Sequence, residues 1–127
     1  MIVQVEILKE IAEIEFSDIV AEVLTGLNTM RIIFTDESYC DVWFSLKLPG
    51  RYSFHWERSF LDGTIYRHDN APHMRWRGMK TFPKHFHNSS EDRVEESYLP
   101  EDPSEAVRYV ISFVSAKIKD LPYTNKT

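Results

Sequence analysis

Imidazole, carboxylate and cationic side chains are concentrated in one stretch of this chain, residues 67–87. All five histidines lie between His55 and His87, and four of them fall in that stretch. Imidazole can transfer protons near neutral pH and can bind a metal as a neutral ligand. A hydrophobic core has no use for this mixture, so we expect a functional site here. The candidate catalytic residues are Arg67, Asp69, His73, His85 and His87, and the candidate substrate-binding residues are His68, Asn70, Arg75, Trp76, Arg77 and Lys84.

The charge of the chain is unevenly distributed. The net charge is −5, but residues 67–88 contain five basic side chains and one acidic side chain. A basic segment on an acidic protein can bind phosphate groups while the rest of the surface repels them. Arg75-Trp76-Arg77 suits phosphate contacts combined with base stacking. The alternatives are an ordinary basic loop that acidic neighbours neutralise, and a core or interface tryptophan between two exposed arginines.

Length and composition indicate one folded domain, residues 1–127. The hydrophobic fraction is 43%, which excludes a disordered chain, and no apolar run is long enough to span a bilayer. The N-terminal segment has Glu6 and no basic region before its apolar residues, so we expect no signal peptide and a cytoplasmic location. Cys40 is the single cysteine, which excludes an internal disulfide and favours a small buried side chain over a nucleophile.

The hydrophobic periodicity predicts an α+β fold, with one antiparallel sheet and a helix at each end of the chain packed on it. Residues 3–14 have near-helical apolar spacing, although Val3-Val5-Ile7 also fits a strand. We expect the meander to contain strands near residues 19–24, 30–34, 39–46, 52–57 and 64–68. The alternation of residues 52–57 places Phe54 and Trp56 on its buried face.

The C-terminal helix has clear signals at both ends. Asp102 is suited to cap it, Pro103 to occupy its first position, and Glu105 to complete the capping box. Pro122 should end the helix. Between these ends, the apolar stripe that should face the sheet consists of Val107, Val110, Ile111, Val114 and Ile118.

The register of the hairpin between residues 52–57 and 64–68 depends on its turn. If Asp62-Gly63 is a two-residue loop, Glu57 lies opposite His68, and Arg58 faces Arg67. A slip of one residue would move every side chain to the other face, so the register stays open. In either register, Arg67-His68-Asp69-Asn70 brings polar groups to the end of a strand at the sheet edge, where active-site residues often lie.

The loop after that strand allows two kinds of site. Pro72 favours a defined turn that fixes His73 relative to Asp69 and Asn70, although the last two could simply bind the turn backbone. In a strand, His85 and His87 would share one face, with Lys84 and Phe86 on the other. With His73 and Asp69 they would make a three- or four-ligand metal site; two solvated histidines would look the same in sequence.

Two strings of residues resemble the signature of the TumE-type toxins of bacterial and archaeal type II toxin–antitoxin modules. They are Tyr66–His73 and Thr81–His87, and Tyr52–Trp56 and Val94–Ser97 also fit. The resemblance covers roughly residues 28–118. The family often has histidines where Met74 and Lys84 stand, which argues against a site of paired histidines here.

The resemblance implies a toxin with a small antitoxin partner, which we expect to be acidic where it covers the basic segment. Our leading hypothesis is a metal-independent ribonuclease. His73 with His85 or His87 would act as base and acid, Arg67 and Lys84 would hold the phosphate, Asp69 would orient an imidazole, and Trp76 would stack a base. No cofactor is favoured. The alternatives are a metal-dependent hydrolase whose ligands are His73, His85, His87 and Asp69, and a non-catalytic binding module for a partner protein or nucleic acid. The oligomeric state, a homodimer included, stays open.

Overall fold

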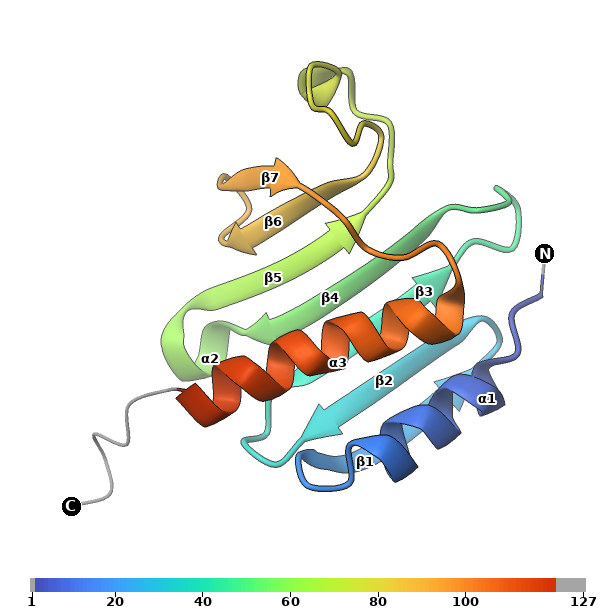
Figure 1. The fold of residues 1–127 in the computed structure, drawn as a ribbon, viewed down its shortest axis with the longest axis vertical. Helices are drawn as coiled ribbons and strands as arrows, with labels where there is room; N and C mark the ends of the chain where they lie inside the picture. Colours follow the sequence, from blue (N-terminus) through green and yellow to red (C-terminus); the bar gives the residue numbers. More distant parts are fainter. Residues whose placement is uncertain (1, 121–127) are drawn as a thin grey trace.

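The computed structural model describes residues 2–120. It contains one seven-stranded antiparallel sheet with a helical segment before it and a longer helix after it in the chain (Figure 1). The strands pair in the order in which they occur in the chain, as expected for a meander. The elements are α1 (Val5–Glu10), a π-helical turn η1 (Ile11–Glu15), β1 (Val20–Gly26), β2 (Thr29–Phe34), β3 (Tyr39–Phe44), β4 (Tyr52–Arg58), α2 (Ser59–Asp62), β5 (Thr64–Asp69), a 3₁₀ turn η2 (Met74–Trp76), β6 (His85–Ser89), β7 (Val94–Glu96) and α3 (Pro103–Asp120). The predicted α+β architecture is therefore confirmed.

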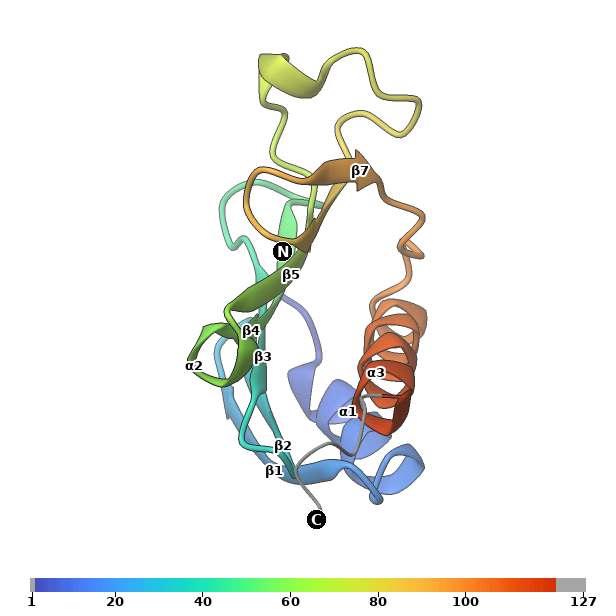
Figure 2. The ribbon, with the colours of Figure 1, turned by 90° about the vertical axis from the view of Figure 1, so that its left-hand side faces the viewer.

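Both long helical segments pack on the same face of the sheet (Figure 2). We call this the helix face and the opposite side the outer face. The core between the layers contains Trp56, Val42 and Ile32 from the sheet, each at most 2% exposed, and Ile111 from α3, which is fully buried. Phe54 also belongs to this core, so the predicted buried face of β4 is confirmed. Cys40 is fully buried, as predicted, and burial raises the pKa of its thiol far above the ordinary value.

The C-terminal helix forms as its sequence signals predict. The backbone N–H of Glu105 donates to the Asp102 carboxylate at 3.0 Å, which caps the first turn. Four of the five predicted stripe residues are buried, and Ile118 packs at the edge of the core. Pro122 lies outside the described residues. No helix in the described part of the chain is long and apolar enough to cross a membrane.

The structure fixes the register of the β4–β5 hairpin, which the sequence left open, and it is not the register of a two-residue loop. Ser59–Asp62 forms a helical turn that Gly63 ends at a φ of 80°, so the connection is longer than two residues. Arg58 therefore pairs with Thr64, and His68 lies opposite Phe54 instead of Glu57. Relative to the register of a two-residue loop, the pairing of β5 with β4 is shifted by an odd number of residues. Each β5 side chain therefore lies on the opposite face of the sheet from the one that the two-residue loop would give. His68 points to the helix face, and Arg67 shares the outer face with His55.

The last two strands place the end of β5 inside the sheet and not at its edge. β6 pairs with β5 so that Asp69 lies opposite His85 and Arg67 lies opposite His87. β7, which the hydrophobic pattern did not predict, pairs with β6 and forms the edge. The long connection between β5 and β6, residues 70–84, projects beyond the sheet (Figures 1 and 2). The sheet thus brings together residues from both ends of the polar stretch.

Candidate active site on the outer face of the sheet

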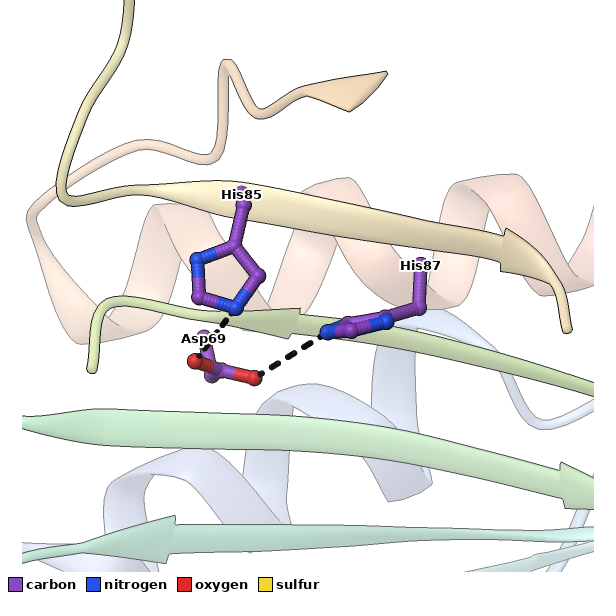
Figure 3. Close-up of side chains that lie close together, drawn as sticks. All are labelled: Asp69, His85 and His87. Carbon is purple, nitrogen blue, oxygen red and sulfur yellow. Dashed lines mark ion pairs between the residues drawn. The ribbon is translucent and has the colours of Figure 1, made fainter. Parts of the chain in front are cut away.

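Three side chains from adjacent strands converge on the outer face. Asp69 comes from the end of β5, and His85 and His87 come from β6 and point toward it (Figure 3). Nε2 of His85 lies 3.0 Å from Oδ1 of Asp69, and Nε2 of His87 lies 3.8 Å from Oδ2. The predicted pairing of His85 with His87 on one face is confirmed by their ring contact, with 5.0 Å between centroids. We call these three residues the Asp-His-His cluster.

Backbone carbonyls fix the orientation of both imidazoles. Nδ1 of His85 donates to the carbonyl of Pro83 at 3.0 Å, and Nδ1 of His87 donates to the carbonyl of Glu91 at 2.9 Å. A carbonyl oxygen only accepts, so Nδ1 carries the proton in each ring. In both rings, Nε2 is therefore the atom left to bind or exchange a proton near Asp69.

The cluster is almost closed to solvent. The side chains of His85, His87 and Asp69 are 1%, 8% and 12% exposed. Nε2 of His85 has no aligned hydrogen-bond partner in spite of its short distance to Asp69. A buried polar atom without an aligned partner is uncommon in folded proteins and often marks a functional position.

The surroundings separate the pKa values of the two histidines. Burial disfavours the charge on His85, but the contact with Asp69 outweighs burial and raises its pKa above the ordinary value. Burial lowers the pKa of His87, and the nearby Arg67 guanidinium lowers it further. Burial alone would raise the pKa of Asp69, but His85, together with the Ala71 N–H and Arg67, lowers it to about 2. Relative to the free side chains, the cluster therefore favours the cationic form of His85, the neutral form of His87 and the ionised form of Asp69.

Arg67 closes one side of the cluster. Its Nε donates to Asp69 Oδ2 at 3.1 Å, and its terminal nitrogens bind the carboxylate of Glu91. Nη1, which also binds Glu91, lies 3.4 Å from Nδ1 of His55. Glu91 was not among the residues predicted from the sequence, although it touches both Arg67 and His87. The only sequence feature that pointed to Glu91 was its position four residues after His87, which lets a turn bring the two side chains together.

The 70–84 loop brings two aromatic rings next to His85 from the other side. The ring centroids of His73 and Trp76 lie 6.1 Å and 6.4 Å from that of His85. Arg75 stacks its guanidinium 4.6 Å from the Trp76 centroid, and Arg77 donates to the carbonyl of Met74. Arg75 and Arg77 are exposed, whereas Trp76 is half-buried. The loop thus presents cationic groups beside the cluster.

Three predicted site residues lie elsewhere or have other partners. Asn70 accepts from the N–H of Tyr52 and donates to the carbonyl of Gly50, so it ties the start of the loop to β4. Lys84 donates to the carbonyl of Leu99. His68 is on the helix face, where it stacks on Phe86 with 4.3 Å between centroids. Their predicted substrate contacts stay predictions.

The cluster could also hold a divalent metal. One ligand atom from each of its three residues lies within 4.8 Å of the other two. Imidazoles that donate Nδ1–H to carbonyls and present Nε2 are oriented as metal ligands are. His73, the fourth ligand considered from the sequence, is exposed, and its ring lies beside that of His85. The three residues whose ligand atoms lie close together are Asp69, His85 and His87.

Comparison with known protein families matches residues 5–118 to the family described as Toxin TumE. The chain belongs to the TumE toxin family. No curated protein and no solved structure matches the chain in the corresponding searches. The family assignment confirms the resemblance inferred from the residues around positions 66–73 and 81–87. It assigns the chain to a class of toxins.

Proposed function

We propose that this TumE protein is the toxin of a toxin–antitoxin module and that it cleaves RNA at the Asp-His-His cluster without a metal. One observation carries the proposal: two imidazoles of fixed tautomer present their Nε2 atoms next to one buried carboxylate, and their pKa values are shifted in opposite directions. Two neighbouring titratable groups with separated pKa values are suited to act as acid and base.

The roles follow from the protonation states. Neutral His87 would accept the proton of a ribose 2′-hydroxyl, and the oxygen would attack the adjacent phosphorus. Cationic His85 would donate its Nε2 proton to the departing 5′-oxygen. Asp69 would hold His85 cationic and oriented, and Arg67 would offset charge on the phosphate. The products would be a 2′,3′-cyclic phosphate and a 5′-hydroxyl.

The loop supplies the elements that RNA binding needs. Arg75, Arg77 and Lys80 are exposed, so they are available to phosphates. Trp76 offers a ring face for a base at 6.4 Å from the proposed acid. Because the cluster is almost closed, RNA must displace part of the 70–84 loop before His85 can reach a leaving oxygen.

Cleavage of a fluorescent single-stranded RNA in the presence of EDTA tests the proposal. His85→Gln and His87→Gln should each slow cleavage by about 100-fold or more, the usual contribution of a general acid or base. His55→Gln is the matched control, since His55 lies on the same face of the neighbouring strand. It should keep most of the activity, because Arg67 retains its bonds to Asp69 and Glu91 without His55. A 2′-deoxy substitution at the cleaved position should abolish the reaction. No cleavage of any RNA, with or without metal, would rule the proposal out.

The unaligned Nε2 atom of His85 supports a second candidate, a metal-dependent hydrolase. In that case a metal at Asp69, His85 and His87 would activate water, EDTA would stop cleavage, and the products would carry a 5′-phosphate. The 2′-deoxy substrate would still be cut. The chemistry of the ends thus distinguishes the two candidates.

A further inference from the structure

A groove of about 730 Å³ lies on the helix face, away from the candidate active site. Its floor contains His68 of β5 and Phe86 of β6, and α3 forms the opposite wall with Tyr109 and Phe113. Phe113 meets Phe86 edge-on at 5.7 Å between ring centroids, and Tyr109 meets His68 at 5.8 Å. The groove is therefore walled by aromatic rings.

Apolar surface remains uncovered at the mouth of this groove. Tyr109 is 41% exposed, and Tyr98, which also lines the groove, is 65% exposed. His68 at the floor is 7% exposed and is held neutral at physiological pH, since burial lowers its pKa to about 4. The floor and walls thus offer apolar contacts and ring faces to an occupant.

The rim of the groove is acidic. Glu95, Glu96 and Glu105 are among the residues that line it, and Glu95 lies opposite Phe86 on the helix face. Arg108 is the one Lys or Arg among the residues described as lining the groove. Arg108 already pairs with Glu15 at 2.8 Å and with Glu105. Carboxylates repel the phosphates of RNA, whereas they attract Lys and Arg, which also bind favourably over aromatic faces. Glu95 also lies 3.8 Å from the exposed Arg93, so the acidic charge of the rim is partly offset. The excess of glutamates among the lining residues still favours a basic protein segment over RNA.

We propose that the groove binds a basic, apolar segment of the antitoxin, and that binding there inhibits the toxin from behind its active site. This inference rests on the proposed toxin role. The floor residues alternate along the strands with the cluster: His68 precedes Asp69, and Phe86 lies between His85 and His87. A segment that shifts His68 or Phe86 must shift the backbone that aligns the cluster. The antitoxin then need not cover the basic loop, unlike the acidic partner expected from the sequence.

The test uses the product of the reading frame that neighbours this chain's gene, where an antitoxin is expected, as the probe in calorimetric titrations of the full-length chain. Glu95→Lys and Tyr109→Ala should each weaken its binding by about tenfold or more. Matched controls are Glu22→Lys on β1 and Phe60→Ala on α2, both exposed and outside the groove. They should bind within about twofold of the wild type. Circular dichroism melting curves identify any variant that fails to fold.

The outcomes separate this inference from the proposed function. If the groove variants cleave RNA like the wild type but escape inhibition by the probe, the inference is supported. It is overturned if the probe does not bind the wild type, if the groove variants bind normally, or if only an Arg75→Glu/Arg77→Glu variant loses binding. Failure of the wild type to cleave RNA while groove-dependent binding persists would refute the ribonuclease proposal alone.

Discussion

The buried ring of His68 should make the stability of the fold depend on pH. His68 is 7% exposed, its Nδ1 lies 2.7 Å from Oγ of Ser97, and its ring stacks on Phe86. Burial, reinforced by the charge of Lys84, lowers the pKa of His68 from 6.5 to about 4. Protonation of this ring is therefore much less favourable in the folded protein than in the unfolded chain.

The sign and size of the effect follow from that difference. A group whose pKa is lowered on folding contributes its full stability above the unfolded value, and this stability is lost as the pH falls toward the folded value. The difference between 6.5 and about 4 corresponds to about 3.4 kcal/mol. Of this, about 2.5 kcal/mol should be lost between about pH 7.5 and about pH 4.5.

Urea unfolding of the wild type and of His68→Phe across this pH range measures the effect. Phenylalanine keeps the contact with Phe86 but cannot titrate, and it loses the bond to Ser97, so the variant should be less stable by about 1 kcal/mol at neutral pH. Near pH 4.5 the order should reverse, because only the wild type has lost the His68 contribution. His73→Phe at an exposed position is the control and should follow the wild-type curve. Parallel pH curves for the wild type and His68→Phe would refute the argument.

Three further perturbations probe other elements of the structure. Ile111→Ala in the fully buried stripe of α3 should lower the free energy of unfolding by about 2–5 kcal/mol in urea titrations, and a loss below about 1 kcal/mol would contradict the burial of that side chain. Asp102→Ala removes the cap bond to the N–H of Glu105 and should cost about 1 kcal/mol in the same assay, with Asp102→Asn retaining most of the stability. Trp76→Ala should weaken RNA binding by about 1–3 kcal/mol in fluorescence anisotropy titrations while changing the melting temperature little, and unchanged affinity would exclude base stacking on this ring.

The elements with strong local signals could be predicted from the sequence. α3 has a cap at Asp102, a proline at its first position and a regular apolar stripe, and these signals are local to the segment that they describe. The strands of the meander were likewise located by alternation and turn residues. The short edge strand β7 could not be found, because three half-buried residues have too little periodicity to distinguish a strand from a loop.

The hairpin register was not predictable because it depends on one turn. Asp62-Gly63 fits a two-residue loop by its residue types, but the chain forms the α2 turn before Gly63 takes the positive φ. That difference moved His68 to the helix face and left Asp69 on the outer face with His85. The sequence therefore predicted which kinds of side chain the site contains. Only the pairing of β5 with β6 shows that Asp69, His85 and His87 are the ones that meet.

The same alternation explains how one pair of strands can carry two surfaces of opposite charge. On β5 and β6, outer-face residues form the Asp-His-His cluster beside a basic loop, and helix-face residues floor a groove with an acidic rim. One layer of sheet separates the two, so an RNA on the outer face and a basic segment in the groove need not compete for space. Inhibition from the groove must then act through the alignment of the cluster. It should lower the rate of cleavage while leaving the affinity for RNA largely unchanged, whereas a partner that covers the basic loop would lower the affinity first.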